Sequence, residues 1–570
     1  MKKLLALLLC LVMVASVIAG CGPTANQPDN TGDQGGATGD DTNPAVRDTL
    51  PDPSEITINI GIPDQGSVED YDTNALTLWL EEQTGYDIEF TKYMPSENDY
   101  KTKLSTQMVD GKPLPDMLLG FNLGRSYYQD LGEDDYLVDL KQFFEDEELS
   151  GAWWDRLEEL PEETQNFIKS KLYSDDGEHI WALPSTDYSE YDSLENTMFI
   201  NKTWLDELQL EVPTDRDSLY KVLKAFKTQD PNGNGKPDEY PILSGIGNMF
   251  GGDPVDWIIN TYMFHNDSLW RVGEDGQVYL PYFSDEYREA LIYINKLVDE
   301  GLLDESCWTF STDNLKGMLA ADLQTVGAFC GHPTLVFAAE NEGIYNWIPL
   351  NNFGYTPIRT GSYEFTSFIT TDCEYPEAAW NVYMLLCSEE GSFRVRYGQK
   401  DVDWVDADAG SKSFLGYDAK IKVLNESLWM ANANTQCWNK VTGVTMGIGT
   451  ENEYCQLSDD STEWTKYKMD LMKQTYDAHM KGNEKRPDNV ISYQIVYTAE
   501  EEEIIDVWRA NIQSLITQAR TSFCRGTSTN GKYTNPADDA QWAAYKQQAI
   551  DDGYEEWRSM AQAVYDDVRN

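Results

Sequence analysis

The chain has 570 residues, of which 41% are hydrophobic and 12% aromatic, so it is long enough for two or more globular domains with large cores. Its formal net charge of −55 at pH 7 repels phosphate backbones and anionic membrane surfaces, which argues against a role in nucleic-acid binding. We therefore expect a globular protein with no nucleic-acid partner.

The N-terminus carries a targeting pattern. Lys2 and Lys3 precede an apolar stretch that ends before Cys21 and is short for a transmembrane helix, which needs about 20 apolar residues. This order is typical of an export signal over residues 1–20. The sequence "VIAGC" resembles a bacterial lipobox, so we expect cleavage before Cys21 and a lipid on this cysteine. The mature chain would then be anchored on the extracytoplasmic face of the cell membrane.

Residues 21–55 are rich in Gly, Pro, Asn, Asp and Thr and almost free of large apolar residues. Such a composition cannot bury a core, so the segment is predicted to be a disordered tether. The mature chain keeps seven further cysteines without a CxxC pair, which favours buried free thiols over disulfides or a zinc site (Cys307, Cys330, Cys373, Cys387, Cys437, Cys455 and Cys524).

The first folded segment alternates strands and helices. Strand patterns at 56–62, 86–90 and 116–120 are separated by a helical pattern at 75–85 and by a second one marked by Tyr100, Leu104 and Met108. The order βαβαβ predicts an α/β fold, in which ligands gather at the carboxyl ends of the strands.

Three later helices have clear ends. The segment 213–226 offers Thr214 as N-cap, 284–301 runs from Ser284 to Gly301, and 376–391 has a proline in its first turn and Gly391 after its last.

The segment Asp230–Pro241, "DPNGNGKPDEYP", begins like an EF-hand calcium loop, with oxygen side chains on alternate residues and Gly235 at the sharp bend. The twelfth position is Pro241 instead of a bidentate Glu, and the carboxylates of Asp238 and Glu239 come early. The segment is therefore not an EF-hand. It is either a shortened metal-binding loop or a polar Asn-Gly turn.

Six stretches spread over most of the mature chain share their order and spacing with one known family. They are "GEHIWALP" (177–184), the segment 199–241, "SDEYREALIYINKLVDEGLLD" (284–304), "DCEYPEAAWNVYMLLCSEEG" (372–391), "YGQKDVDW" (397–404) and the tail 541–567. Together they resemble the extracellular solute-binding lipoproteins of bacterial ABC importers, in particular the oligosaccharide-binding branch.

This resemblance implies an α/β, two-lobed periplasmic-binding-protein-like fold of type II, with a mixed sheet flanked by helices in each lobe and extra C-terminal helices. One lobe would comprise residues 56–183 and about 362–405, and the other about 184–361 and 406–570. The lobes would close on the ligand by a hinge motion. The implied function is capture of an oligosaccharide and delivery to membrane permease subunits, by a monomer that catalyses no reaction.

The resemblance also implies that the shortened loop binds a structural Ca²⁺, because members of this branch carry such a loop. Three carboxylates and three neutral oxygens suit this hard cation. The ligands carried over position by position are the side chains of Asp230, Asn232, Asn234, Asp238 and Glu239 and the carbonyl of Lys236.

A sugar site needs aromatic platforms and fixed polar partners. Loop placement makes Tyr188, Trp257, Trp404 and Trp438 candidate platforms, although packing in the core is an equally good account of each tryptophan. The candidate polar partners are Asp64, Gln65, Asn122, Glu190 and Asp403.

Two alternatives stay open. A glycosidase needs two carboxylates at a fixed separation, and a chain with 98 acidic residues neither shows nor excludes such a pair. A sugar sensor without a transport role would have the same sequence features.

Overall fold

The structure is a computed structural model. It describes residues 50–569 apart from 65, 67, 161, 189–190, 192–193, 195, 247–251, 266–269, 322–323, 338–344, 357–362, 430–432, 439–445, 449–453, 481–484, 492–493 and 529–530. The chain divides into Met1–Asn43 and Pro44–Asn570, and all described elements belong to the second unit. The predicted signal, Cys21 and most of the tether lie outside the described residues.

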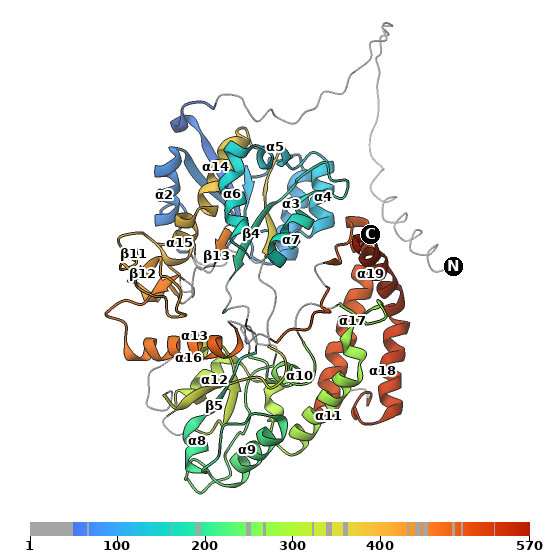
Figure 1. Ribbon diagram of the computed structural model, residues 1–570. Coiled ribbons are helices and arrows are strands. Elements are labelled where there is room, and N and C mark those ends of the chain that lie inside the picture. Colours follow the sequence, from blue (N-terminus) through green and yellow to red (C-terminus); the bar gives the residue numbers. More distant parts are fainter. Residues whose placement is uncertain are drawn as a thin grey trace, which may run out of the picture. The chain divides into compact units, whose positions relative to one another are not determined.

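A six-stranded mixed sheet forms the first half of the fold (Figure 1). Its strand order is β13-β4-β10-β3-β1-β2; β1 is parallel to β2 and β3, and β10 is antiparallel to β3 and β4. The bounds are Thr57–Pro63 for β1, Asp87–Tyr93 for β2, Met117–Leu118 for β3, Leu183–Tyr188 for β4, Tyr363–Ile369 for β10 and Met446–Ile448 for β13. The predicted βαβαβ order is confirmed.

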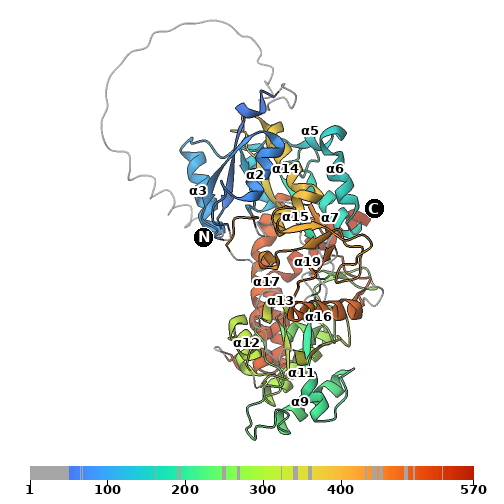
Figure 2. The same ribbon diagram turned by 90° about the vertical axis from the view of Figure 1, so that its left-hand side faces the viewer.

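The helices of this half are α2 (Ala75–Thr84), α3 (Glu97–Val109), α4 (Arg125–Glu133), α5 (Lys141–Phe144), α6 (Glu147–Glu158), α7 (Glu162–Leu172), α14 (Pro376–Cys387) and α15 (Glu389–Tyr397). Figure 2 shows α2 beside α14, which also contacts α6 and β10. The side chain of Asn74 caps α2 by accepting the Leu76 N–H, and Gly85 ends it at φ 77°. These two residues explain why the sequence pattern located this helix well.

A second core surrounds the antiparallel sheet β8-β5-β9 (Ala328–Cys330, Met198–Asn201 and Trp347–Leu350). Around it lie α8 (Lys202–Glu207), α9 (Arg216–Thr228), α10 (Pro254–Ile259), α11 (Asp285–Asp299), α12 (Thr312–Leu319), α13 (Pro333–Val336), α16 (Glu463–His479) and a hairpin of β6 (Arg271–Val272) and β7 (Val278–Tyr279).

The C-terminal helices α17 (Ala499–Arg525), α18 (Asp539–Asp551) and α19 (Tyr554–Arg569) pack together, and α17 lies along α11 (Figure 1). Their apolar side chains belong to the same core as the β8-β5-β9 sheet. The predicted extra C-terminal helices are therefore present and are part of this half.

The strand pairing of the first sheet crosses two of the predicted lobe boundaries. The predicted first lobe ends at 183 and at 405, but β4 extends the first sheet to Tyr188 and β13 joins that sheet from residues 446–448. A small sheet of β11 (Trp404–Asp406), β12 (Ile421–Val423) and β14 (Cys455–Gln456) lies in the chain between α15 of the first half and α16 of the second half. These pairings are non-local, and residue patterns along the chain do not encode them.

Two helix ends also differ from prediction. The N-cap of α9 is Asp215 and not Thr214, because Asp215 and Ser218 form a reciprocal capping box. The predicted helix 376–391 is two helices, since Ser388 ends α14 and accepts the Gly391 N–H at the start of α15. Gly391 is therefore inside a helix instead of after one.

The seven described cysteines are free and buried, as predicted. Burial raises the pKa of the Cys307 thiol to about 12, which makes this thiol unreactive at neutral pH. Within the described residues, no helix is both long and apolar enough to cross a membrane.

A buried ion network joins α17 to α10. The Arg520 guanidinium contacts Asp256 and lies 3.3 Å from Asp253 Oδ2, while His265 Nε2 lies 3.0 Å from Asp256 Oδ1. Asp253 also caps α10 by accepting the N–H groups of Val255 and Asp256. The network therefore fixes the position of α17 against α10.

We expect Arg520→Met to lower the free energy of unfolding by about 3–5 kcal/mol, because it leaves the buried Asp253 carboxylate and the partly buried Asp256 carboxylate without their cation. Chemical denaturation followed by fluorescence measures this change. Arg525→Met is the matched control, since Arg525 pairs with Glu305 at the surface and such pairs contribute about 0–1 kcal/mol. Equal losses in the two variants would contradict the assignment.

Candidate functional site

One predicted site residue lies at the carboxyl edge of the first sheet. Asp64 follows β1, accepts the Gly66 N–H at 3.1 Å and lies 3.5 Å from Lys92 Nζ. The Lys92 ammonium lies 5.1 Å from the centre of the Tyr71 ring, which meets the predicted Trp438 edge-on at 6.3 Å. The structure thus brings Asp64 and Trp438 into one neighbourhood with two residues that the sequence analysis missed.

The positions of Lys92 and Tyr71 relative to the predicted strands could have identified both residues from the sequence. Lys92 is the penultimate residue of β2, the strand that pairs in parallel with β1, so its side chain lies near the end of β1. Parallel neighbours bring their carboxyl ends to one edge, and the same argument that selected Asp64 applies to Lys92. Tyr71 lies in the loop between β1 and α2.

Asp403 and Trp404 organise a turn beside β11. The Asp403 carboxylate accepts the Gln399 N–H and an N–H of the Asn425 amide, each at 2.8 Å. The Trp404 indole donates to the Gly398 carbonyl at 2.9 Å. Both side chains are buried, so in this structure their hydrogen bonds serve the turn itself.

Three of the predicted platforms occupy separate cores. Trp257 lies in α10 and packs edge-on against Phe353 at 5.4 Å, Trp438 belongs to the core of the first sheet, and Trp404 to that of the small β11-β12-β14 sheet. Each of the three is at most 2% exposed. A ring stacks on a sugar only through an open face, so this placement favours the packing account that the sequence left open.

The other predicted ligand residues are dispersed. Asn122 follows β3 and is exposed, with its amide 3.5 Å from Glu97 Oε2. Tyr188 is the last residue of β4. Gln65 and Glu190 lie outside the described residues.

The shortened loop folds around its own polar side chains. The Asp230 carboxylate accepts the N–H groups of Asn234 at 3.1 Å and Gly235 at 2.9 Å, and Asn234 Oδ1 accepts the Lys236 N–H at 2.7 Å. The amides of Asn232 and Asn234 donate to Asp238, which lowers the pKa of that carboxyl. Gly233 and Gly235 adopt positive φ. The loop is therefore compact and carries oxygen atoms on several residues.

Glu239 distinguishes this loop from a simple turn. Its side chain is 3% exposed, and its Oε1 atom is buried without a hydrogen-bond partner. Burial and the neighbouring Asp238 and Asp230 raise the pKa of the Glu239 carboxyl. Among the described residues, no three side chains of His, Cys, Asp or Glu lie close enough together to form a metal site. The carboxylates of Asp230, Asp238 and Glu239 would therefore have to draw together around a cation, with amide and carbonyl oxygens completing the donor set. The unpartnered Glu239 oxygen fits that donor set.

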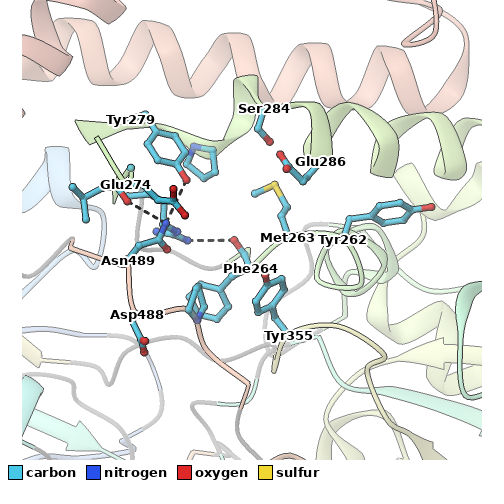
Figure 3. Close-up of a pocket in the computed structure, with 15 residues that line it drawn as sticks. Tyr262, Met263, Phe264, Glu274, Tyr279, Ser284, Glu286, Tyr355, Asp488 and Asn489 are labelled. Carbon is cyan, nitrogen blue, oxygen red and sulfur yellow. Dashed lines mark hydrogen bonds between the residues drawn. The ribbon is translucent and has the colours of Figure 1, made fainter. Parts of the chain in front are cut away.

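The second half contains a cavity of about 550 Å³, which none of the predicted site residues lines. Figure 3 shows Ser284 and Glu286 on one side, Tyr279, Glu274 and Asn489 on the other, and Met263, Phe264 and Tyr355 beneath them. The walls come from the loop after α10, the β6–β7 hairpin, the start of α11 and the segment 487–489.

Backbone pairing fixes two walls of this cavity. The Val272 N–H donates to the Asn489 carbonyl at 3.0 Å, and the Asn489 amide donates to the Val272 carbonyl at 3.2 Å and to the Tyr279 hydroxyl at 3.4 Å. Arg271 is buried and donates to the carbonyls of Trp270 and Phe264. Burial lowers the pKa of its guanidinium to about 10. The sequence analysis missed this cavity because its walls come from four segments of the chain and from Tyr355 in a fifth.

The family model described as bacterial extracellular solute-binding protein matches residues 64–382, more than half of the chain. The chain belongs to this family.

One curated relative is the fructooligosaccharide ABC transporter substrate-binding protein FusA of Streptococcus pneumoniae serotype 4, which is 28% identical over 248 residues, or 42% of this chain and 44% of that protein. The matched region thus spans less than half the length of this relative.

Solved structures align over nearly their whole length. A solute-binding protein of Bifidobacterium longum infantis, described as HMO-binding and ABC-transporter-associated, has a TM-score of 0.67 and 20% identity, with 90% of this chain and 98% of that chain covered. An EF-hand mutant of S. pneumoniae FusA in complex with fructo-nystose has a TM-score of 0.60 and 20% identity, with 90% and 99% covered. These likenesses show that the fold is the predicted type II solute-binding fold.

A buried histidine gives the second half a predictable pH response. His479 ends α16, is 5% exposed, and burial lowers the pKa of its imidazole from 6.5 to about 4. The ring is therefore neutral in the folded protein at pH 5 to 7, whereas the unfolded chain binds a proton below pH 6.5. Stability from this group is complete above pH 6.5 and is lost as the pH falls toward 4.

The wild-type protein should lose unfolding free energy as the pH falls from 6.5 to 4. We expect His479→Gln to reduce this loss by up to about 3 kcal/mol. Unfolding free energies from denaturant titrations across this range measure it. His479→Asn, a second neutral replacement of the same ring, should flatten the profile to the same extent. An unchanged slope in either His479 variant would contradict the prediction.

Proposed function

We propose that this protein captures a carbohydrate, most simply an oligosaccharide, outside the cell and delivers it to the permease of an ABC transporter. The observation that carries the proposal is family membership together with the match of the described fold to nearly the whole length of carbohydrate-associated binding proteins. The curated relative matched over 248 residues is itself described as an ABC transporter substrate-binding protein for fructooligosaccharide.

We propose export and anchoring from the N-terminal pattern. Residues 1–20 would direct export, Cys21 would carry the lipid, and the following segment up to about residue 50 would tether the folded part to the membrane. A globular part with a large negative charge would remain away from anionic lipids on such a tether.

For the ligand site we propose the carboxyl edge of the first sheet, around Asp64, Lys92 and Tyr71. The Asp64 carboxylate and the Lys92 ammonium are an acceptor and a donor for sugar hydroxyls, held 3.5 Å apart. Asn122 is exposed beyond the end of β3, the other parallel neighbour of β1. Polar side chains after neighbouring parallel strands support a common site.

We propose binding without turnover. The relatives and solved structures are described as binding proteins, which supports this role over that of a glycosidase. A sugar sensor remains the second candidate, because the same binding fold serves either role. Release of reducing ends from an incubated oligosaccharide would identify a glycosidase, and a neighbouring permease or histidine kinase gene would separate transport from sensing.

We propose that the Asp230–Glu239 loop binds Ca²⁺. The ligands would be the side chains of Asp230, Asn232, Asn234, Asp238 and Glu239 with the Lys236 carbonyl, and the ion would supply the positive charge that the buried Glu239 oxygen lacks. The EF-hand mutant described for FusA supports a comparable loop in that relative. The role would be structural, holding the loop after α9.

The first test is a thermal-shift screen of the full chain against neutral and acidic oligosaccharides. A ligand at about a hundredfold excess over its Kd should stabilise the folded protein by about 2.7 kcal/mol. Asp64→Asn should weaken binding about tenfold, because a charged hydrogen-bond partner is lost. Asp87→Asn, at the opposite end of the same strand pair, should bind normally. No stabilisation by any sugar, or equal binding by both variants, would contradict the proposal.

The second test removes the metal. A chelator should lower the melting temperature of the wild-type chain, and Ca²⁺ at about a hundredfold excess over its Kd should restore about 2.7 kcal/mol. Glu239→Gln should abolish the response to Ca²⁺, while Glu211→Gln, an exposed acid outside the loop, should retain it. A wild-type protein indifferent to both chelator and Ca²⁺ would disprove the site.

A further inference from the structure

We propose that the cavity of the second half is a separate binding site for a small neutral saccharide. This proposal rests on the proposed function for the class of ligand, and it adds a site that lies apart from Asp64 and its neighbours. The cavity has about 550 Å³, within the range of about 300–1,000 Å³ that is usual for small-molecule sites.

Two aromatic side chains of the cavity are partly exposed, unlike the predicted platforms Trp257, Trp404 and Trp438. Tyr279 and Tyr355 are both half-buried and line the cavity from different segments. Figure 3 places them on different sides, with Phe264 beside Tyr355, which it meets edge-on at 6.1 Å. Two partly exposed rings on a shared cavity can each contact the apolar C–H face of a sugar.

Polar groups complete the lining. Glu274 and Glu286 are exposed and present carboxylate oxygens, which accept hydrogen bonds from hydroxyls. Asp488 is exposed at the rim, and its carboxylate points away from the opposite walls in Figure 3. Asn489 is held by its amide donors to Val272 and Tyr279, so its side chain is positioned before any ligand arrives. Such pre-organisation reduces the entropy lost on binding.

The charges select against anions. Two carboxylates, those of Glu274 and Glu286, line the cavity together with one guanidinium, that of Arg271, which is 3% exposed and already donates to two backbone carbonyls. A carboxylate or sulfate on the ligand would approach these two like charges. The side chain of Tyr262 points away from the cavity in Figure 3, and the centre of its ring lies 4.0 Å from the guanidinium carbon of Arg216. This ring is therefore not part of the proposed site.

The test places a reporter at the rim. In Asp488→Cys, with Cys10 and Cys21 replaced by serine, a small environment-sensitive fluorophore on the new thiol reports on the cavity, because the seven remaining native cysteines are buried. Glu207→Cys with the same label is the control, since Glu207 is exposed and does not line the cavity. The probes are sucrose, 1-kestose, cellobiose and chitobiose, with digalacturonate as the anionic probe, and the full chain is used throughout.

We expect at least one neutral probe to change the emission at position 488 saturably, with no response to digalacturonate and none from the label at position 207. Adding Tyr355→Ala and Glu286→Gln should raise the midpoint of that titration about tenfold or more. No response to any neutral probe, a response to digalacturonate, a response from both labels, or a midpoint unchanged by the two substitutions would overturn the proposal.

A parallel measurement separates this proposal from the proposed function. Thermal stabilisation of the unlabelled chain by oligosaccharides reports on binding anywhere in the molecule. Stabilisation that persists in Tyr355→Ala/Glu286→Gln, with no response at position 488, would overturn the second site and leave the proposed function intact. A response at position 488 with no effect of Asp64→Asn on stabilisation would support the second site and count against the first.

Discussion

The position of the second half's cavity depends on the buried contact between Arg520 and the two carboxylates of α10. Asp253 begins α10, and Asp256 in its first turn pairs with His265 beyond the helix. The segment between these two contacts contains Met263 and Phe264, which form the base of the cavity. The contacts of Arg520 with Asp253 and Asp256 connect α10 and this segment to α17. This ion network therefore holds the segment that forms the base of the cavity against the C-terminal helix.

Local signals in the sequence predicted local structure well. The helical pattern at 75–85 matches α2, which the structure shows to be bounded by Asn74 and Gly85, and Ser284 caps α11 as expected. Two helix ends were predicted wrongly for different reasons. Asp215 lies beside Thr214 and caps α9 because it pairs with Ser218. Ser388 ends α14 and also caps α15, so one predicted helix is two. The sequence offers both choices, and only the hydrogen bonds in the structure decide between them.

Sites assembled from distant segments were less predictable. Aromatic content suggested platforms, but Trp257, Trp404 and Trp438 fill three cores, while Tyr279 and Tyr355, which line the cavity, are partly exposed. Burial depends on tertiary packing, which residue identity alone does not specify. The metal loop is the opposite case, because its donors lie within ten consecutive residues; the structure adds the buried, unpartnered oxygen of Glu239.

The central claim is reversible capture of a carbohydrate by a protein of the solute-binding family. Native mass spectrometry of the full chain with a neutral oligosaccharide tests it most directly. The account predicts a complex whose mass equals that of the protein plus intact sugar, and release of the sugar at unchanged mass. Absence of a complex with every oligosaccharide tried, or recovery of a shortened sugar, would contradict it.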